Sequence, residues 1–248
     1  MGTRAREESR QLRKGKAAIA KEGGGRRRWP VIAGLAVIVV LVVLIVFTIV
    51  RSSKTASPGS GTLVPPRGAE GGALVTGQAA APVKLEVYVD YMCAYCGRFE
   101  RTNGAEIVRM VGDGTTRLYL HPLAFLDQMS NGTRYSTRAA NAVATVYDRA
   151  PDKLLAFNNV LFEHQPEEGS KGLSDVQIAD LARGIGVPSP VADAFDDRIF
   201  EPWVTTSNDA AFDSGIEGTP TVKINGVVFE GDLYTVGPLT QAVTAAAK

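Results

Sequence analysis

The sequence predicts an α/β fold with a central sheet, preceded by one transmembrane helix. In this fold a βαβ half and a ββα half are separated by a helical insertion. Three observations predict it. Residues 31–50 form an uncharged apolar run, strand patterns occur near both ends of residues 83–248, and segments with helical spacing lie between them. The chain of 248 residues is therefore divided into a short membrane part and one domain of ordinary size.

Residues 1–30 are predicted to be a basic cytoplasmic tail. They contain ten Lys and Arg residues against three Asp and Glu, whereas the rest of the chain contains 17 basic and 23 acidic residues. Basic residues stay on the cytoplasmic side of a membrane segment, so this asymmetry predicts a cytoplasmic N-terminus and contact with anionic lipid. No nucleic-acid partner is expected, because no aromatic residues are interleaved with the basic ones.

Residues 31–50, VIAGLAVIVVLVVLIVFTIV, are predicted to be a transmembrane anchor. A helix of this length spans about 30 Å, the thickness of the hydrocarbon core of a bilayer. The run is longer than the apolar region of a cleavable signal peptide, which favours a signal-anchor in a single-pass protein of the cell membrane. Residues 51–82, rich in Ser, Gly, Pro and Ala, are predicted to be a flexible linker to an extracytoplasmic domain.

The domain is predicted to cover residues 83–248 and to begin with a βαβ unit. Residues 85–89 (LEVYV) are rich in β-branched and aromatic side chains and predict a strand. A helix is predicted from the following cysteine pair to about Met110, with Gly112-Asp113-Gly114 as its end. Residues 116–121 (TRLYLH) predict the second strand.

Four helices are predicted to form the insertion, and a hairpin and a final helix to follow it. Helical spacing of apolar residues, a capping box and a Pro near a helix start place the four helices around residues 139–147, 154–162, 174–181 and 189–199. Thr221–Ile224 and residues 227–229 flank Asn225-Gly226, a dipeptide typical of a two-residue hairpin turn. The last helix is predicted from Pro238 to Ala247.

The only two cysteines, Cys93 and Cys96, follow the first strand as a Cys-x-x-Cys pair. A zinc site is disfavoured, because zinc needs four ligands and His121 and His164 form no ligand motif with the pair. A structural disulfide closing so short a loop would stabilise the fold little. A redox dithiol is favoured, because a helix N-terminus lowers the pKa of the first thiol, and the second lies within one turn to resolve a mixed disulfide.

Two motifs give the domain a resemblance to a known family. Asp90-Tyr91-Met92-Cys93-Ala94-Tyr95-Cys96 follows the first strand, and Gly215-Ile216-Glu217-Gly218-Thr219-Pro220-Thr221-Val222 precedes the hairpin. With the helical insertion between them, they resemble the DsbA-like branch of the thioredoxin superfamily. The resemblance covers roughly residues 82–248, and the membrane anchor makes the whole chain similar to an exported, actinobacterial-type oxidoreductase. It implies a thioredoxin fold.

The resemblance also implies roles for individual residues. Cys93 is expected to be the nucleophile and Cys96 the buried resolving thiol. Thr219-Pro220 is expected to be a cis peptide that faces the dithiol, with the Thr219 backbone pairing with an extended substrate. Ala94 and Tyr95 are expected to contact substrate. No cofactor and no metal ion are expected.

The sequence departs from the family pattern at two places. DsbA-type oxidants often carry Pro-His between their cysteines, whereas this chain has Ala94-Tyr95, and isomerases of the DsbC and DsbG type are similar in having Tyr there. Thioredoxin-like proteins often have a buried carboxylate six residues before the first cysteine, where this chain has Val87. Glu86 and Asp90 are the nearest acidic residues, and a charged Asp90 near the thiolate would raise the pKa of that thiol.

The predicted function is that of an extracytoplasmic thiol–disulfide oxidoreductase that introduces disulfides into exported proteins through Cys93 and Cys96. The resemblance implies two kinds of partner: reduced exported proteins and a membrane reoxidase of the DsbB or vitamin K epoxide reductase type. A membrane-tethered thiol reductase or disulfide isomerase with the same site is the main alternative. A redox-inactive binding module on the membrane is a more remote one, disfavoured by the intact cysteine pair and Thr219-Pro220.

Overall fold

The computed structural model describes residues 63–248. The predicted basic tail (1–30), the predicted transmembrane anchor (31–50) and the first part of the predicted linker lie outside the described residues. In the part of the chain that is described, no helix combines the length and apolar character needed to cross a bilayer.

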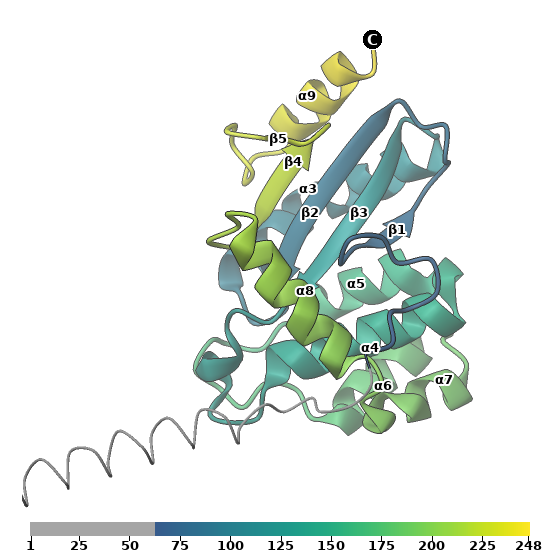
Figure 1. The fold of residues 1–248 in the computed structure, drawn as a ribbon, viewed down its shortest axis with the longest axis vertical. Coiled ribbons are helices and arrows are strands. Elements are labelled where there is room, and N and C mark those ends of the chain that lie inside the picture. Colours follow the sequence, from purple (N-terminus) through teal and green to yellow (C-terminus); the bar gives the residue numbers. More distant parts are fainter. Residues whose placement is uncertain (1–62) are drawn as a thin grey trace, which may run out of the picture. The chain divides into compact units, whose positions relative to one another are not determined.

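A five-stranded sheet forms the centre of the domain, with the strand order β1-β3-β2-β4-β5 (Figure 1). Its strands are β1 (Leu74–Thr76), β2 (Val83–Asp90), β3 (Thr116–Leu123), β4 (Thr221–Ile224) and β5 (Val227–Val228). The central strand β2 runs parallel to β3 and antiparallel to β4. The βαβ and ββα halves that the sequence predicts are both present, and they meet at the β2–β4 pair.

The predicted linker extends less far along the chain than expected. Leu74–Thr76 forms β1, which pairs antiparallel with β3, and Ala73 and Leu74 are fully buried. The Tyr147 hydroxyl donates to the carbonyl oxygens of Gly68 and Val75. A strand of only three residues beside Gly77 is too short to show a period that predicts it, and pairing with the edge of β3 stabilises it. The folded domain therefore begins well before residue 83.

Helices cover both faces of the sheet. Helix α3 (Ala94–Gly112) lies behind β2 and β3 in Figure 1, while α8 (Glu201–Asp213) crosses in front of them. The C-terminal helix α9 (Pro238–Ala246) packs against α3 and β2. Because both faces are covered, β2 is buried along nearly its whole length, which accounts for its continuous apolar run.

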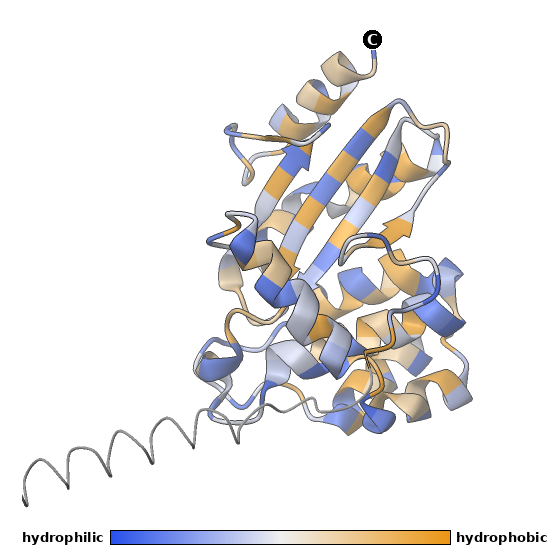
Figure 2. Cartoon of the chain, viewed as in Figure 1, coloured by the Kyte–Doolittle hydropathy of each residue, from blue (hydrophilic) through white to orange (hydrophobic). Residues whose placement is uncertain are grey.

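The insertion contains five α-helices where the sequence predicted four. They are α4 (Tyr135–Arg149), α5 (Leu154–Glu163), α6 (Asp175–Gly184), α7 (Ser189–Asp193) and α8. Short 3₁₀ turns lie at Asp127–Ser130, Pro151–Lys153 and Ala194–Asp197. The helix predicted over 189–199 is α-helical only to Asp193 and continues as the 3₁₀ turn Ala194–Asp197, which ends where Arg198 adopts a left-handed conformation with φ 55°. Helix α8 was missed because its residues are mostly pale in hydropathy (Figure 2) and give no clear apolar stripe.

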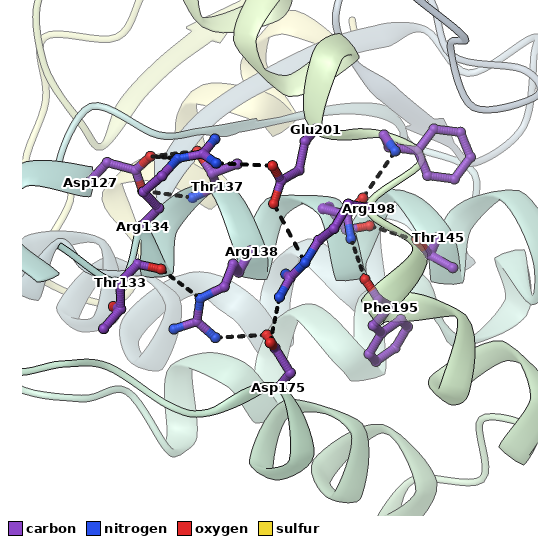
Figure 3. Close-up of polar contacts among 12 residues, drawn as sticks. Asp127, Thr133, Arg134, Thr137, Arg138, Thr145, Asp175, Phe195, Arg198 and Glu201 are labelled. Atoms are coloured by element: carbon purple, nitrogen blue, oxygen red, sulfur yellow. Dashed lines mark hydrogen bonds and ion pairs between the residues drawn. The ribbon is translucent and has the colours of Figure 1, made fainter. Parts of the chain in front are cut away.

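A chain of alternating charges ties the insertion together (Figure 3). Arg134 Nη1 lies 3.1 Å from Glu201, and Arg138 Nη1 lies 2.8 Å from Asp175. Arg198 joins the two pairs by contacting both Asp175 and Glu201. These residues come from the starts of α4, α6 and α8 and from the turn before α8, so the network fixes where those helices begin relative to one another.

Candidate active site

The two cysteines lie at the start of α3, directly after β2. Cys93 is the N-cap residue with an extended backbone (φ −71°, ψ 114°), and Cys96 is in the first turn. Both are free thiols, and Cys93 is 5% exposed while Cys96 is fully buried. Ala94 and Tyr95 between them face the surface, with Tyr95 62% exposed. The resemblance implied an exposed Cys93 and a buried Cys96; the structure instead buries both thiols, Cys96 more completely than Cys93.

The environment of Cys93 favours its thiolate. The Cys96 thiol donates to it, and backbone N–H groups of Tyr95 and Cys96 in the first helical turn and the Thr219 side chain add further hydrogen bonds. These interactions outweigh partial burial and lower the pKa of Cys93 from 9.0 to about 6. A helix N-terminus therefore stabilises the thiolate without the histidine that the related oxidants often carry.

Cys96 is in the opposite situation. Burial and its interaction with Cys93 raise the pKa of Cys96 well above the ordinary value. Its sulfur lies 3.5 Å from the backbone N of Asp90, at the end of β2. One thiol of the pair is thus ready to attack at neutral pH, while the other stays protonated until it is needed.

Thr219 and Pro220 lie against the dithiol although they are more than 120 residues away in sequence. The Thr219–Pro220 peptide bond is cis, as the resemblance implied. The Cys93 thiol donates to the Thr219 carbonyl oxygen across 3.3 Å. The structure therefore brings together Cys93, Cys96 and Thr219, and Ala94 and Tyr95 border them on the surface.

Asp90 is fully buried beneath the active-site turn and accepts three hydrogen bonds. Their donors are Met92 N at 2.8 Å, Leu126 N at 2.8 Å and Ser136 Oγ at 2.6 Å. Burial raises the pKa of Asp90 to about 7 in spite of these bonds. The carboxyl group holds the turn to α4 and to the loop after β3, and it repels Cys93 too weakly to prevent the low pKa of that thiol.

Glu100 is a second buried carboxyl group in α3, one turn beyond Cys96. Burial raises the pKa of Glu100 to about 7, with a smaller opposing effect from Asn158. Its side chain folds over Gly104, where an added Cβ would lie only 2.7 Å from Glu100 Oε1. The burial of Glu100 was not predicted from the sequence, because a single acidic residue in an amphipathic helix is ordinarily exposed.

Two side chains from the segment after α5 also hold the active-site turn. Gln165 Nε2 donates to the carbonyl oxygens of Tyr91 (3.2 Å) and Cys93 (2.8 Å). Glu168 Oε1 accepts from the backbone N of Ala94 at 2.8 Å. Gly97 leaves space for the Gln165 side chain, since a Cβ at residue 97 would lie 2.0 Å from Gln165 Oε1. No sequence signal identifies these residues, because the insertion brings them back to the dithiol from a distance.

The aromatic residues near the dithiol divide between packing and surface roles. Tyr91 and Phe99 are fully buried, and the Tyr91 hydroxyl donates to Asn158 at 2.9 Å. Tyr95 instead faces Tyr234, and the centroids of the two rings lie 5.9 Å apart. Of these three aromatic residues, Tyr91 and Phe99 pack in the core and Tyr95 lies on the surface.

The arrangement can carry out thiol–disulfide exchange. A thiolate that is stable at neutral pH can attack a disulfide, or leave from a mixed disulfide, while the neighbouring thiol closes the cycle. Among residues 63–248, no group of three or more His, Cys, Asp or Glu side chains is arranged to hold a metal ion.

Comparison with known proteins identifies a matching family and several similar proteins. The family model described as thioredoxin matches residues 69–237. The chain is similar to the serine/threonine-protein kinase PknE of Mycobacterium tuberculosis, with 33% identity over 114 residues, or 44% of this chain. It spans only about a fifth of the length of that kinase.

Two further relatives match over more of their own length. Disulfide bond formation protein D of Bacillus subtilis is 27% identical over 159 residues, which are 63% of this chain and 69% of that protein. The solved structure of MdbA, a thiol-disulfide oxidoreductase from Actinomyces oris, is 29% identical with a TM-score of 0.63. That match covers 73% of this chain and 88% of MdbA. The thioredoxin-like fold expected from the two motifs is confirmed.

Proposed function

The chain belongs to the thioredoxin family, and from this premise we propose that it is a thiol–disulfide oxidoreductase that introduces disulfides into exported proteins. The observation that carries the proposal is the lowered pKa of Cys93, about 6, beside a buried Cys96 whose pKa is raised. A stable Cys93 thiolate stabilises the reduced form of the protein, and a dithiol that prefers to be reduced gives its disulfide away.

In the proposed cycle a substrate thiolate attacks Cys93 Sγ of the Cys93–Cys96 disulfide. A mixed disulfide forms, and Cys96 leaves and takes up a proton. The second substrate thiolate then attacks the substrate sulfur of the mixed disulfide, and Cys93 leaves as a thiolate. Its low pKa makes Cys93 a good leaving group, so the substrate gains a disulfide and the protein is left as a dithiol.

The Thr219 carbonyl and the exposed Ala94 and Tyr95 are the proposed substrate-binding surface of this site. We place the site outside the cytoplasm, on a domain anchored by residues 31–50, because of the charge pattern of residues 1–50. A membrane reoxidase of the DsbB or vitamin K epoxide reductase type would then restore the disulfide.

Trapping of substrates tests the exchange itself. In cells that produce the full chain with Cys96→Ser, the mixed disulfide on Cys93 cannot be resolved by the protein. We expect exported proteins to run off the diagonal with it on non-reducing/reducing gels. Cys93→Ser in the same background is the control and should trap none. Absence of trapped partners with Cys96→Ser would count against an oxidoreductase.

The reduction potential of the Cys93–Cys96 pair tests the direction of transfer. The purified full chain is equilibrated with glutathione buffers, and the fraction of disulfide is measured. We expect a value toward that of strongly oxidising dithiols, about −120 mV. A value near that of thioredoxin, about −270 mV, would make the protein a reductant and leave the exchange chemistry standing.

A further inference from the structure

A groove opens between α8 and the loop after β3. Its volume is about 720 Å³. Phe125 and Leu126 line one side, Phe212 of α8 lines the other, and buried Tyr88, Leu123 and Ile216 support its floor together with Phe125. Phe212 is 64% exposed, so a large apolar side chain faces solvent at the rim.

Three carboxylates also line the groove. Asp209 and Asp213 lie on α8, and Glu217 lies in the loop that follows it. All three are exposed, and within the described residues none of them forms an ion pair or accepts a side-chain hydrogen bond. The groove thus combines exposed negative charge that has no cationic partner among the described residues with an exposed apolar side chain.

Two segments that line the groove also lead to the dithiol. Glu217 lies two residues before Thr219, whose carbonyl oxygen accepts from Cys93. On the other side, the Leu126 backbone N donates to Asp90, which holds the active-site turn. Since an extended chain advances about 3.3 Å per residue, a substrate whose cysteine is at Cys93 can reach Glu217 within a few residues.

We propose that this groove, here called the acidic groove, binds the part of a reduced substrate next to its reacting cysteine. The segment it fits is extended and alternates basic with large apolar residues. The apolar side chains would cover Phe125 and Phe212, while the basic ones would neutralise Asp209, Asp213 and Glu217. Attraction between the charges also increases the rate at which such segments reach the dithiol. This inference rests on the proposed function, because it assigns a substrate class to that site.

Binding can be tested without any redox step. The probe is a fluorescein-labelled peptide that alternates Arg with Leu and Phe around a Ser in place of the reacting cysteine. Its affinity for the full chain is measured by fluorescence anisotropy at low and at physiological salt. We expect Asp209→Asn/Asp213→Asn to weaken binding about fivefold to tenfold at low salt, less so at higher salt. Phe212→Ser should weaken binding by a similar factor at both salt concentrations.

A matched double variant separates a local groove from general charge attraction. Asp196→Asn/Asp197→Asn removes the same charge from exposed residues of the insertion that do not line the groove. It should leave peptide affinity within about twofold of the unchanged protein. Equal weakening by both double variants, or no weakening by Asp209→Asn/Asp213→Asn, would overturn the proposal.

The cysteine-containing version of the peptide separates this proposal from the proposed function. If the Ser peptide binds in the groove but the dithiol peptide is not oxidised by the disulfide form, the exchange function fails and the groove stands. If dithiol peptides are oxidised at one rate whether their flanking residues are basic or acidic, the groove fails and the function stands. Faster oxidation of the basic peptide, lost in Asp209→Asn/Asp213→Asn, supports both.

Discussion

The acidic residues of the active-site region and those of the insertion show two different ways of placing carboxyl groups inside a protein. Asp90 and Glu100 lie beneath the dithiol with no cation beside them among the described residues, and burial raises the pKa of each to about 7. Asp175 and Glu201 lie in the insertion between arginines (Figure 3). Burial alone would raise the pKa of Asp175, but Arg138 and Arg198 outweigh it and lower that pKa.

The difference separates a region that responds to pH from one that does not. Near neutral pH, Asp90 and Glu100 change charge beside a thiol whose own pKa is about 6. In the insertion, Asp175 has a lowered pKa and keeps its charge at the same pH. The fold thus combines an insertion in which Asp175 stays charged with a site in which Asp90, Glu100 and Cys93 can exchange protons at little cost in free energy near neutral pH.

The largest effect is expected when Asp90 loses its carboxyl group. Asp90→Ala leaves the buried Met92 N–H and Ser136 hydroxyl and the partly buried Leu126 N–H without an acceptor. Each such loss costs about 1–3 kcal/mol, so we expect unfolding free energy to fall by about 4 kcal/mol in denaturant titrations. Asp127→Ala is the matched control, because Asp127 also accepts bonds at the start of α4, from Thr137 N and Oγ1, but is partly exposed. Because water can replace the Asp127 oxygens, Asp127→Ala should lower the unfolding free energy less than Asp90→Ala does. An equal loss would show that burial does not distinguish the two carboxylates.

The second effect is a pH dependence that Glu100→Gln should abolish. The pKa of Glu100 lies at about 7 in the fold and near 4.5 in the unfolded chain. Its protonated form therefore stabilises the fold at low pH, and this contribution is lost as pH rises through about 7. Between pH 5 and 7, Glu100→Gln should gain about 2 kcal/mol of stability relative to the unchanged protein.

This measurement is best made on the disulfide form, in which Cys93 does not titrate. The comparison of two variants at each pH also cancels His121, whose pKa burial lowers to about 3 and whose effect has the opposite sign. Asp175→Asn provides the contrast. Because its pKa is lowered, its stabilising effect is present at neutral pH and lost below about pH 4. If both variants changed with pH in the same direction, the two regions would not differ in the way described.

The smallest effect is expected from the centre of the ion-pair network. Arg198→Met keeps the length of the side chain and removes its contacts with Asp175 and Glu201. Because these groups are about 30% exposed or less, we expect a loss of about 1 kcal/mol. The rate of thiol–disulfide exchange should remain unchanged. A changed exchange rate at equal stability would show that the network acts on the dithiol and is more than a frame.

The sequence predicted those parts of the fold that local patterns determine. Thr221–Ile224 was located with its full bounds, because Asn225 and Gly226 both adopt the positive φ that a tight hairpin turn requires (49° and 85°). Strand β1 and helix α8 were missed, since each is stable only against the sheet and has no strong period of its own.

The same division holds for the site. Cys93, Cys96 and Thr219 were predicted, because a spacing and a motif identify them within a few residues. Gln165, Glu168 and Glu100 were not, because their roles depend on how the insertion folds back and on which helix face is buried. Such tertiary placement leaves no mark in a single sequence.

The near-complete burial of Cys93 also affects how readily the thiol is damaged by oxidants. A thiol with a pKa of about 6 is mostly thiolate at neutral pH, the form that peroxides convert to sulfenic acid. At 5% exposure, few oxidant molecules reach its sulfur. When one does, the Cys96 thiol beside it condenses with the sulfenic acid, releases water and forms the Cys93–Cys96 disulfide. Under the proposed function that disulfide is the form that oxidises substrates, so the first oxidation of Cys93 would produce the active form of the protein instead of an irreversibly oxidised thiol.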